Sequence, residues 1–508
     1  LINQFISKKT NLRTDEWGGG YENRIKFPLE IIRRTREAVG DNFIIIYRLS
    51  MLDLVEGGST WEDVVQLAKA IEAAGATIIN TGIGWHESRV PTIGTVVPKA
   101  GFAWVTKKMM GEVNIPLITT NRINMPDVAE KVLAEGNADM VSMARPFLAD
   151  PDLVLKSIEG RPEEINTCIA CNQACLDHTF TMQVSSCIVN PRACHETILV
   201  HEPAQLKKKI AVVGAGPAGL EAATVAAKRG HSVVLFEEKH EIGGQFNMAK
   251  VIPGKEEYSQ TIRYYDSMLK KYGVELRLNT RAEEATLIAE AYDEIILATG
   301  VTPRTLDIDG FNHPKVMDYV DVLYKKKTVG NKVAIIGSGG IGFDMAEYLA
   351  HDMAHESVSM NTENYMKEWG VDMTYAKGGA LAEAPQPLAS PRKIYLLKRS
   401  RGKHGKNLGK TTGWIHRSSL IMKEVKMMVD VSYEKIDDLG LHIKVGEVPD
   451  VLDVDHVIIC AGQVSLKELE AGLLAAKQTV HLIGGANITA QLDAKMAIKE
   501  ASELAAKL

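Results

Sequence analysis

The sequence predicts an α/β protein in which barrel-type β/α units precede a cysteine-rich segment and two Rossmann-like nucleotide-binding folds. Three observations predict this order: apolar strands alternate with helices over residues 1–165, four cysteines lie between residues 168 and 187, and two GxGxxG turns follow. Continuous apolar strands that alternate with helices are typical of parallel sheets. The 508 residues provide for about three domains of about 150 residues each.

Composition excludes several classes of function. The formal net charge of −5 argues against a general binder of nucleic acid or anionic membranes. No apolar run reaches the roughly 18–20 residues of a membrane span, and the opening LINQFISKKT lacks the layout of a signal peptide. We expect no nucleic-acid or membrane partners. We also expect a cytoplasmic location and favour a monomer, although the opening residues do not decide targeting because the chain starts at Leu1.

The first region, residues 1–165, contains four strand–helix units. Strands are expected at residues 43–50, 76–84, 115–121 and 138–145. Between them lie amphipathic helices, one of which Ser59 or Thr60 can cap and another of which begins at Pro126. A complete (β/α)8 barrel needs about 250 residues. The sequence therefore predicts the C-terminal half of a TIM barrel, and we expect the first half to lie outside the sequence as given.

Polar side chains gather at the ends of these strands: Arg48, Asn80, His86, Asn121 and Arg145. In a (β/α)8 barrel the carboxyl ends of the strands carry the ligand site. The position of His86 directly after a strand favours a catalytic role, with a purely structural histidine as the alternative.

Residues 166–205 hold most of the cysteines of the chain. The spacing is Cys168-x2-Cys171-x3-Cys175-x11-Cys187, and thiolates so close in sequence can converge on one soft metal centre. Zinc more often shows two CxxC pairs or a CxxC with a spaced histidine pair. Three close cysteines with a distant fourth are nearer to iron–sulfur spacing. We therefore favour an iron–sulfur cluster, with a zinc site or unligated thiols as alternatives.

The first GxGxxG turn, formed by Gly214, Gly216 and Gly219, lies in residues 206–325, and residues 463–508 are expected to complete its fold. A strand and a helix flank the turn, and Glu237 ends the next strand about 20 residues on. Glycines let the backbone approach a pyrophosphate, and the carboxylate accepts hydrogen bonds from a ribose. This context predicts dinucleotide binding, with a merely tight turn as the alternative.

The second GxGxxG turn, formed by Gly337, Gly339 and Gly342, lies in residues 326–462. The strand that follows ends in Lys398 and Arg399 instead of an acid. Cations at this place suit a ribose 2′-phosphate, so we predict a preference for NADPH over NADH, with a solvated basic loop as the alternative. The stretch at about residues 351–390 is an irregular insertion to which no role is assigned.

Motifs from all of these regions resemble the bacterial 2,4-dienoyl-CoA reductases, which belong to the old yellow enzyme-like group with trimethylamine dehydrogenase and enoate reductases. The resemblance covers essentially the whole chain, and its motifs are YRLSMLDLVEGG, ATIINTGIGWHESR, TTNRIN, DMVSMARPFLADP, INTCIACNQACLDH, SCIVNPRACHET, EIGGQF and LGKTTGWIHR. It implies an FMN-binding barrel, a [4Fe–4S] cluster, and an FAD- and NADPH-binding module related to the disulfide reductases.

The resemblance also implies roles for individual residues. Arg48 matches the arginine beside the FMN pyrimidine ring, and His86 matches the active-site histidine. The residues that match FMN phosphate loops are Asn121, Arg122, Ala144 and Arg145. The cluster ligands would be Cys168, Cys171, Cys175 and Cys187. Residues that match FAD contacts are Gly214, Gly216, Gly219, Glu237 and Gln245, and those that match the NADPH site are Gly337, Gly339 and Gly342.

The function implied by this resemblance is NADPH-dependent reduction of 2,4-dienoyl-CoA to enoyl-CoA in the β-oxidation of unsaturated fatty acids. Two features depart from the pattern of the family. The catalytic tyrosine of the family precedes the motif that begins here as LINQF, and Asn487 stands where an aspartate is common near the FAD. The alternatives are another ene-reductase of the same architecture, acting on enoates or enones, and an electron-transfer protein without substrate chemistry.

Overall fold

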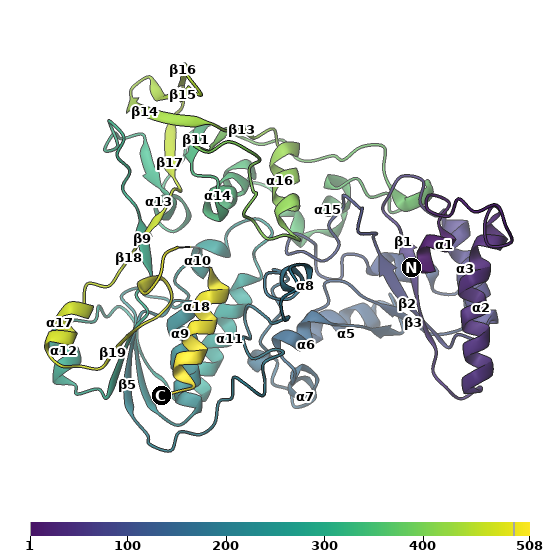
Figure 1. The fold of residues 1–508 in the computed structure, drawn as a ribbon, viewed down its shortest axis with the longest axis horizontal. Helices are drawn as coiled ribbons and strands as arrows, with labels where there is room; N and C mark the ends of the chain where they lie inside the picture. The colour runs from purple at the N-terminus through teal and green to yellow at the C-terminus, as the bar shows by residue number, and fades with distance from the viewer. Residues whose placement is uncertain (1, 491–492) are drawn as a thin grey trace. The chain divides into compact units, whose positions relative to one another are not determined.

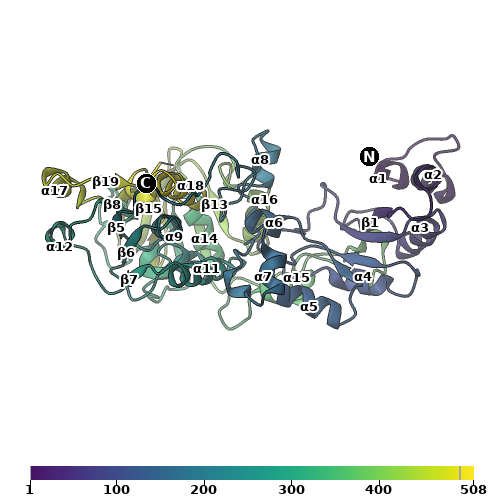
Figure 2. The same ribbon diagram turned by 90° about the horizontal axis from the view of Figure 1, so that it is seen from below.

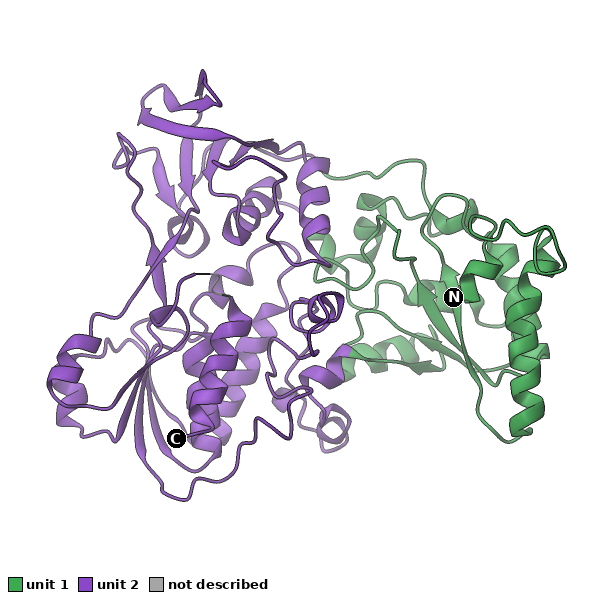
Figure 3. Cartoon of the chain, viewed as in Figure 1, with its two compact units in different colours: residues 1–144, 356–388 green, residues 145–355, 389–508 purple. Residues whose placement is uncertain are grey.

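The computed structural model describes residues 2–490 and 493–508, and the chain divides into two compact units (Figure 3). The first unit comprises residues 1–144 and 356–388, and the second comprises residues 145–355 and 389–508. Within the described residues, no helix is both long enough and apolar enough to cross a membrane.

The first unit is built on a four-stranded parallel sheet in the order β1-β2-β3-β4 (Figure 1). Its strands are β1 (Ile46–Leu52), β2 (Ile78–Ile83), β3 (Leu117–Thr119) and β4 (Met140–Val141), and its helices are α1 (Ile2–Ile6), α2 (Tyr21–Val39), α3 (Trp61–Ala73), α4 (Ala103–Met109) and α5 (Pro126–Ala134). The alternation of parallel strands and helices confirms the barrel-type units predicted from the sequence.

Local sequence explains where two of these helices begin. Thr60, rather than Ser59, caps α3, because its side chain accepts from the backbone N–H of Asp63 while the Asp63 carboxylate accepts from the N–H of Thr60. Such a capping box satisfies two N–H groups that the helix itself cannot pair. Pro126 starts α5, where its missing N–H removes no helical hydrogen bond.

The insertion at about residues 351–390 contains a helix and two 3-10 turns. These elements are η2 (Val358–Met360), α15 (Thr362–Glu368) and η3 (Gly378–Ala380). Residues 356–388 belong to the first unit with the four parallel strands, although the sequence places them inside the second nucleotide fold. The sequence pattern gave no indication of this placement.

The second unit opens with short helices around the cysteine segment and continues into the first nucleotide fold. The opening helices are α6 (Arg145–Ala149), α7 (Leu153–Ile158), η1 (Pro162–Glu164) and α8 (Leu176–Phe180). A five-stranded parallel sheet then has the order β19-β8-β5-β6-β7. Its elements are β5 (Lys209–Val213), α9 (Pro217–Lys228), β6 (Ser232–Phe236), α10 (Phe246–Ala249), α11 (Tyr258–Lys271), β7 (Glu275–Arg277), α12 (Glu284–Ala289), β8 (Glu294–Leu297), α17 (Glu470–Ala475), β19 (Val480–Leu482), η4 (Gly484–Ala486) and α18 (Ala494–Ala505).

The C-terminal part of the chain completes this first nucleotide fold, as the sequence predicts. Strand β19 pairs with β8 in parallel, and α18 packs on α9 (Figure 2). Alanines 218, 222, 223 and 226 of α9 form a common apolar core with alanines 497, 501 and 505 of α18. Small side chains on both helices let the two backbones approach closely, which buries the helix that begins at the first glycine turn.

The second nucleotide fold has a five-stranded parallel sheet in the order β10-β17-β11-β12-β13. Its elements are β10 (Val316–Asp318), α13 (Tyr319–Leu323), β11 (Lys332–Ile336), α14 (Gly340–Ala350), β12 (Lys393–Leu397), α16 (Gly413–Met422), β13 (Lys426–Met428) and β17 (His456–Ile459), with an antiparallel meander of β14 (Val431–Asp437), β15 (Gly440–Val445) and β16 (Val448–Leu452). Strands β9 (Val301–Pro303) and β18 (Gln463–Ser465) pair where the chain enters and leaves this fold.

Candidate functional site

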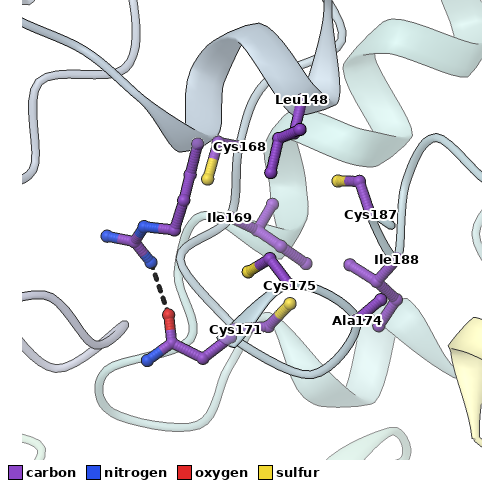
Figure 4. A pocket seen from close by; sticks show the side chains of 10 residues that line it. Leu148, Cys168, Ile169, Cys171, Ala174, Cys175, Cys187 and Ile188 are labelled. Atoms are coloured by element: carbon purple, nitrogen blue, oxygen red, sulfur yellow. Dashed lines mark hydrogen bonds between the residues drawn. The ribbon is translucent and has the colours of Figure 1, made fainter. Parts of the chain in front are cut away.

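The four clustered cysteines line one cavity in the second unit (Figure 4). The other residues around it are Arg145, Leu148, Ile169, Asn172, Ala174 and Ile188. Ala170 and Asn172 have φ values of 54° and 63°, and these left-handed turns bend the chain between the first three cysteines. The structure therefore brings together the residues that the sequence predicts as ligands, and none of the six cysteines forms a disulfide.

The four thiols line one cavity, which fits their predicted role as ligands of an iron–sulfur cluster. In a [4Fe–4S] cluster each cysteine binds a different iron, so the ligands lie around a space. A tetrahedral zinc site would instead bring all four sulfurs within about 2.3 Å of one ion.

The cavity disfavours bare thiolates. Burial raises the pKa of Cys171 well above its ordinary value and also raises the pKa of Cys187, and the nearby cysteines add to both shifts. Burial also raises the pKa of Cys175, although the positive charge of Arg145 opposes this shift. Thiolates at these positions therefore depend on bound metal for their stability, since metal ligation deprotonates a thiol.

Arg145 is placed at this cavity by a hydrogen bond. Its Nη1 donates to Oδ1 of the buried Asn172 at 2.6 Å (Figure 4). The sequence predicts an FMN phosphate contact for Arg145, whereas its described contacts lie with the cysteine segment. Ala144, which precedes α6, is exposed. The phosphate role of these two residues stays a prediction.

A polar row crosses the sheet of the first unit, from the first half of β1 and β2 to the end of β4. Arg48 of β1 pairs in register with Asn80 of β2, and its Nη1 donates to Asn80 Oδ1 at 3.3 Å. The Nδ2 of Asn80 donates in turn to Ser142 Oγ at 3.2 Å, just beyond β4. The Arg48 side chain is exposed at this edge, where the sequence predicts that it lies beside the FMN ring.

Asp53 organises the loops that follow β1 and β2. It is 1% exposed, and its carboxylate accepts from Ser50 Oγ at 2.7 Å, from Ser59 N at 2.8 Å and from Trp85 Nε1 at 2.9 Å. The next residue after Trp85 is His86, which is exposed. Asp53 therefore fixes the start of the turn that presents His86. The sequence prediction did not include Asp53, although a lone aspartate after the strand IYRLSML is a signal for it.

Asn121 and Arg122 follow β3 in left-handed conformations, with φ values of 73° and 59°. Asn121 Nδ2 donates to Thr92 O at 2.8 Å, and Arg122 Nε donates to Val97 O at 2.8 Å. Both side chains are buried. In the described structure they bind the loop after β3 to the loop after β2, and their contact with an FMN phosphate stays a prediction.

The three glycines of the first turn meet different surroundings. A Cβ on Gly214, whose φ is +105°, would lie 2.5 Å from Ala298 O, and a Cβ on Gly219 would lie 1.8 Å from Gly214 O. A Cβ on Gly216 would meet only the Cα of Gly244, at 4.0 Å. Gly214 and Gly219 are therefore required by the fold, and Gly216 leaves open the space through which a pyrophosphate approaches the helix N-terminus.

Glu237 and Gln245 lie beside this turn. Glu237 is 8% exposed, and its two carboxylate oxygens accept from Ala215 N at 2.8 Å and from Lys239 N at 3.0 Å. Each oxygen keeps a lone pair for a ribose hydroxyl. Gln245, which directly precedes α10, is exposed. These contacts fit the predicted FAD site.

The second glycine turn repeats the same division of roles. A Cβ on Gly337, whose φ is +111°, would lie 2.7 Å from Cys460 O, and a Cβ on Gly342 would lie 1.8 Å from Gly337 O. A Cβ on Gly339 would meet nothing within 4 Å. The turn therefore fits a second dinucleotide in the same way.

The two basic residues after β12 differ in their contacts. Lys398 Nζ donates to Gly402 O at 3.3 Å and to Lys403 O at 3.2 Å, which stabilises the loop after the strand. Arg399 is exposed. The structure therefore makes Arg399 the more accessible cation for a 2′-phosphate.

Family models match both parts of the chain. The model described as "NADH:flavin oxidoreductase / NADH oxidase family" matches residues 1–164, and the model described as "Pyridine nucleotide-disulphide oxidoreductase" matches residues 208–489. A metal reductase of Desulforamulus reducens is 35% identical over 96% of this chain and 72% of its own length. The chain belongs to the old yellow enzyme-like FMN/FAD oxidoreductases.

Two further proteins are similar to this oxidoreductase over almost its whole length. A cinnamate reductase of Clostridium sporogenes is 28% identical over 96% of this chain and 70% of its own length. A solved complex of 2-naphthoyl-CoA reductase with 2-naphthoyl-CoA has a TM-score of 0.88 and 32% identity, and the match covers 100% of this chain and 72% of that chain. The oxidoreductase thus has an FMN-binding domain followed by an FAD- and NAD(P)-binding module.

A pair of cysteine variants tests the cluster. We expect about four irons per chain in the parent oxidoreductase when it is purified without oxygen. Cys171→Ala should lose this iron, because one of the four predicted ligands is removed. Cys194→Ala, which changes an exposed cysteine of the same segment, should retain it. Iron and sulfide analysis measures both variants, and one zinc per chain without iron would contradict the prediction.

A pair of glycine variants separates folding from FAD binding. Gly216→Ala should unfold at nearly the parental temperature but lose FAD, because its methyl group occupies open space on the cofactor side. Gly214→Ala should lose stability, since strained backbone of this kind costs about 1–3 kcal/mol. Thermal unfolding and flavin content are the measurements. Parental FAD affinity in Gly216→Ala would contradict the assigned position of the pyrophosphate.

A double variant tests the choice of nicotinamide nucleotide. Replacing Lys398 with Glu and Arg399 with Ser should lower the kcat/KM for NADPH, relative to that for NADH, by about one to two orders of magnitude. The reason is that charge-assisted contacts contribute about 1.5–3 kcal/mol. The kcat/KM of flavin reduction with each nucleotide is the measurement. An unchanged ratio would show that other residues select the nucleotide.

Proposed function

We propose that this oxidoreductase reduces a carbon–carbon double bond conjugated to a CoA thioester with NADPH, and that 2,4-dienoyl-CoA is its substrate in the β-oxidation of unsaturated fatty acids. The observation that carries the proposal is the match to the 2-naphthoyl-CoA reductase complex over the entire chain. That protein acts on an unsaturated acyl-CoA, and the cinnamate reductase also acts on a conjugated double bond, by their names.

The order of the binding sites supports this chemistry. Electrons from NADPH would pass through FAD, the [4Fe–4S] cluster and FMN to the substrate, which is the chemistry that these groups supply when bound. Gly337, Gly339 and Gly342 would hold the nucleotide, and Cys168, Cys171, Cys175 and Cys187 would hold the cluster. Arg48, in the first half of β1, carries the positive charge that would stabilise an electron-rich flavin ring.

His86 is the residue of this chain that we propose to assist protonation of the reduced carbon chain, beside the catalytic tyrosine of the family. It is exposed directly after β2, where catalytic side chains of (β/α)8 barrels lie. Its backbone follows Trp85, whose indole N–H is fixed by Asp53 at 2.9 Å. This bond fixes the side chain next to His86 in the chain, and general acid catalysis requires an imidazole within hydrogen-bond reach of the reacting atom.

Two alternatives differ in substrate. The similarity to the cinnamate reductase favours a free unsaturated acid, as in other ene-reductases for enoates or enones. The similarity to the metal reductase favours transfer of electrons to an external acceptor without substrate protonation. The first alternative needs no binding of CoA, and the second needs no proton donor.

Anaerobic assays of the oxidoreductase distinguish these functions. NADPH oxidation is measured with a 2,4-dienoyl-CoA, with the corresponding free acid, with cinnamate and with ferric citrate. For the oxidoreductase with a complete FMN barrel, we expect turnover of the thioester at about 1 s⁻¹ or more, the lower end of ordinary enzyme rates. Turnover of each of the other acceptors should be at least tenfold slower. Faster reduction of cinnamate or of ferric iron than of the thioester would overturn the proposal in favour of that alternative.

A histidine variant tests the proton donor. His86→Gln should lower kcat with the thioester by about a hundredfold, since general acids contribute about 10²–10⁴-fold, while reduction of ferricyanide stays at the parental rate. His313→Gln, a change in the second nucleotide fold, is the control. An equal effect on both acceptors would mean that His86 acts on electron transfer or folding instead.

A further inference from the structure

The insertion of residues 356–388 has an ordered structure of its own. Asn361 caps α15 by accepting from Asn364 N at 3.0 Å, and Val371 bridges to Leu381 in an antiparallel pair. The Asp372 carboxylate accepts from Thr374 N at 2.9 Å and from Ala376 N at 2.8 Å. The segment leaves the second nucleotide fold after α14 and returns to it before β12, yet it packs in the first unit.

Tyr375 of this insertion holds the loop after β1. Its hydroxyl contacts both Met51 O and Ser59 O at 3.2 Å, which spans the two ends of that loop. The side chain is 5% exposed, and its ring meets the edge of Trp61 at a centroid distance of 5.6 Å. The loop held in this way contains Asp53, which accepts from Ser59 N and from the Trp85 indole.

Gly379 approaches the same loop with its backbone. Its N–H donates to Ser59 O at 2.8 Å, and its carbonyl accepts from Leu54 N at 3.0 Å. A Cβ on Gly379, whose φ is +81°, would lie 2.1 Å from Val55 O. The two backbones therefore approach so closely that only glycine fits at this position. The contact pairs the C=O of Ser59 and the N–H of Leu54, which have no partner within β1 or α3.

Tyr365 holds the neighbouring loop after β2. Its hydroxyl donates to Pro91 O, its side chain is 0% exposed, and its ring meets the edge of Phe102 at 6.4 Å. The next carbonyl, Thr92 O, accepts from Asn121 Nδ2 at 2.8 Å. Tyr365 thus lies one residue away from the bond that joins the loops after β2 and β3.

We propose that the insertion forms part of the ligand site at the end of the barrel strands. Tyr375 and Tyr365 are positioning residues, and each holds a different loop of that site. Tyr375 fixes the loop that carries Asp53 and, through Trp85, the turn of His86, so it serves the ene substrate. Tyr365 fixes the loop bonded to Asn121, so it serves the FMN phosphate. The assignment of the two ligands rests on the proposed function, and the loop contacts themselves do not.

Two phenylalanine variants of the whole oxidoreductase separate these duties, because each removes one hydroxyl and keeps the ring. Tyr375→Phe should accelerate amide hydrogen exchange in residues 51–59 by about three- to tenfold, the effect of losing one ordinary hydrogen bond. Tyr365→Phe should do the same in residues 89–98. Tyr272→Phe, which changes a tyrosine at the end of α11, should change neither segment.

The ligand readouts follow the same division. Tyr375→Phe should lower kcat/KM for the ene substrate by about three- to tenfold, while the affinity for FMN stays at the parental value. Tyr365→Phe should lower the affinity for FMN by a similar factor. NADPH-driven ferricyanide reduction should be unchanged in both variants. Parental exchange in both loops, or equal acceleration throughout the chain, would overturn the proposal. If the exchange and FMN results hold but no ene substrate is reduced even by the parent, the proposed function fails and the role of the insertion stands.

Discussion

Four cysteine thiols that line one cavity set the chemistry of the second unit, with Cys168 buried and the other three partly buried. Burial raises the pKa of Cys171, Cys175 and Cys187, so the thiolates that a metal needs are not stable there alone. Binding of iron and formation of the thiolates are therefore one event, and metal ligation contributes to the stability of the whole segment. The left-handed turns at Ala170 and Asn172 and the contact with Arg145 serve this one arrangement.

The glycine turns show a second constraint, in which the backbone itself is the binding group. In each nucleotide fold the first and third glycines are excluded from bearing a Cβ by a carbonyl of their own fold, and the middle glycine faces open space. The two turns therefore have the same construction. They differ at the following strand, where Glu237 accepts backbone hydrogen bonds in one fold and Lys398 donates them in the other. We therefore propose that this strand end selects the nucleotide.

Features that depend on local spacing could be predicted from the sequence. The four strands of the first unit, the returning strands β8, β17 and β19, and the two glycine turns follow from short patterns, and the structure confirms them. The sequence also allowed the prediction that Cys187 lies near the three earlier cysteines, because only a short segment separates them. Lys398 was less predictable, since its charge is visible in the sequence but its contacts with Gly402 and Lys403 are not.

Features that depend on distant contacts could not be predicted. Tyr375 meets Met51 across 324 positions of sequence, and no periodicity in residues 356–388 points to a barrel loop. Asp53 is an ordinary strand-end aspartate until Trp85 and Ser59 are seen to donate to it. In the proposed function the substrate contacts such loops, so the sequence indicates the redox groups more sharply than the substrate.

We propose that electrons from the nucleotide folds reach the barrel through the cysteine segment. To follow them, the oxidoreductase is mixed with NADPH under anaerobic conditions, and samples are frozen at successive times for electron paramagnetic resonance and flavin absorbance. We expect the signal of a reduced iron–sulfur cluster to follow FAD reduction and to precede FMN reduction. Full reduction of both flavins without a cluster signal at any time would contradict it.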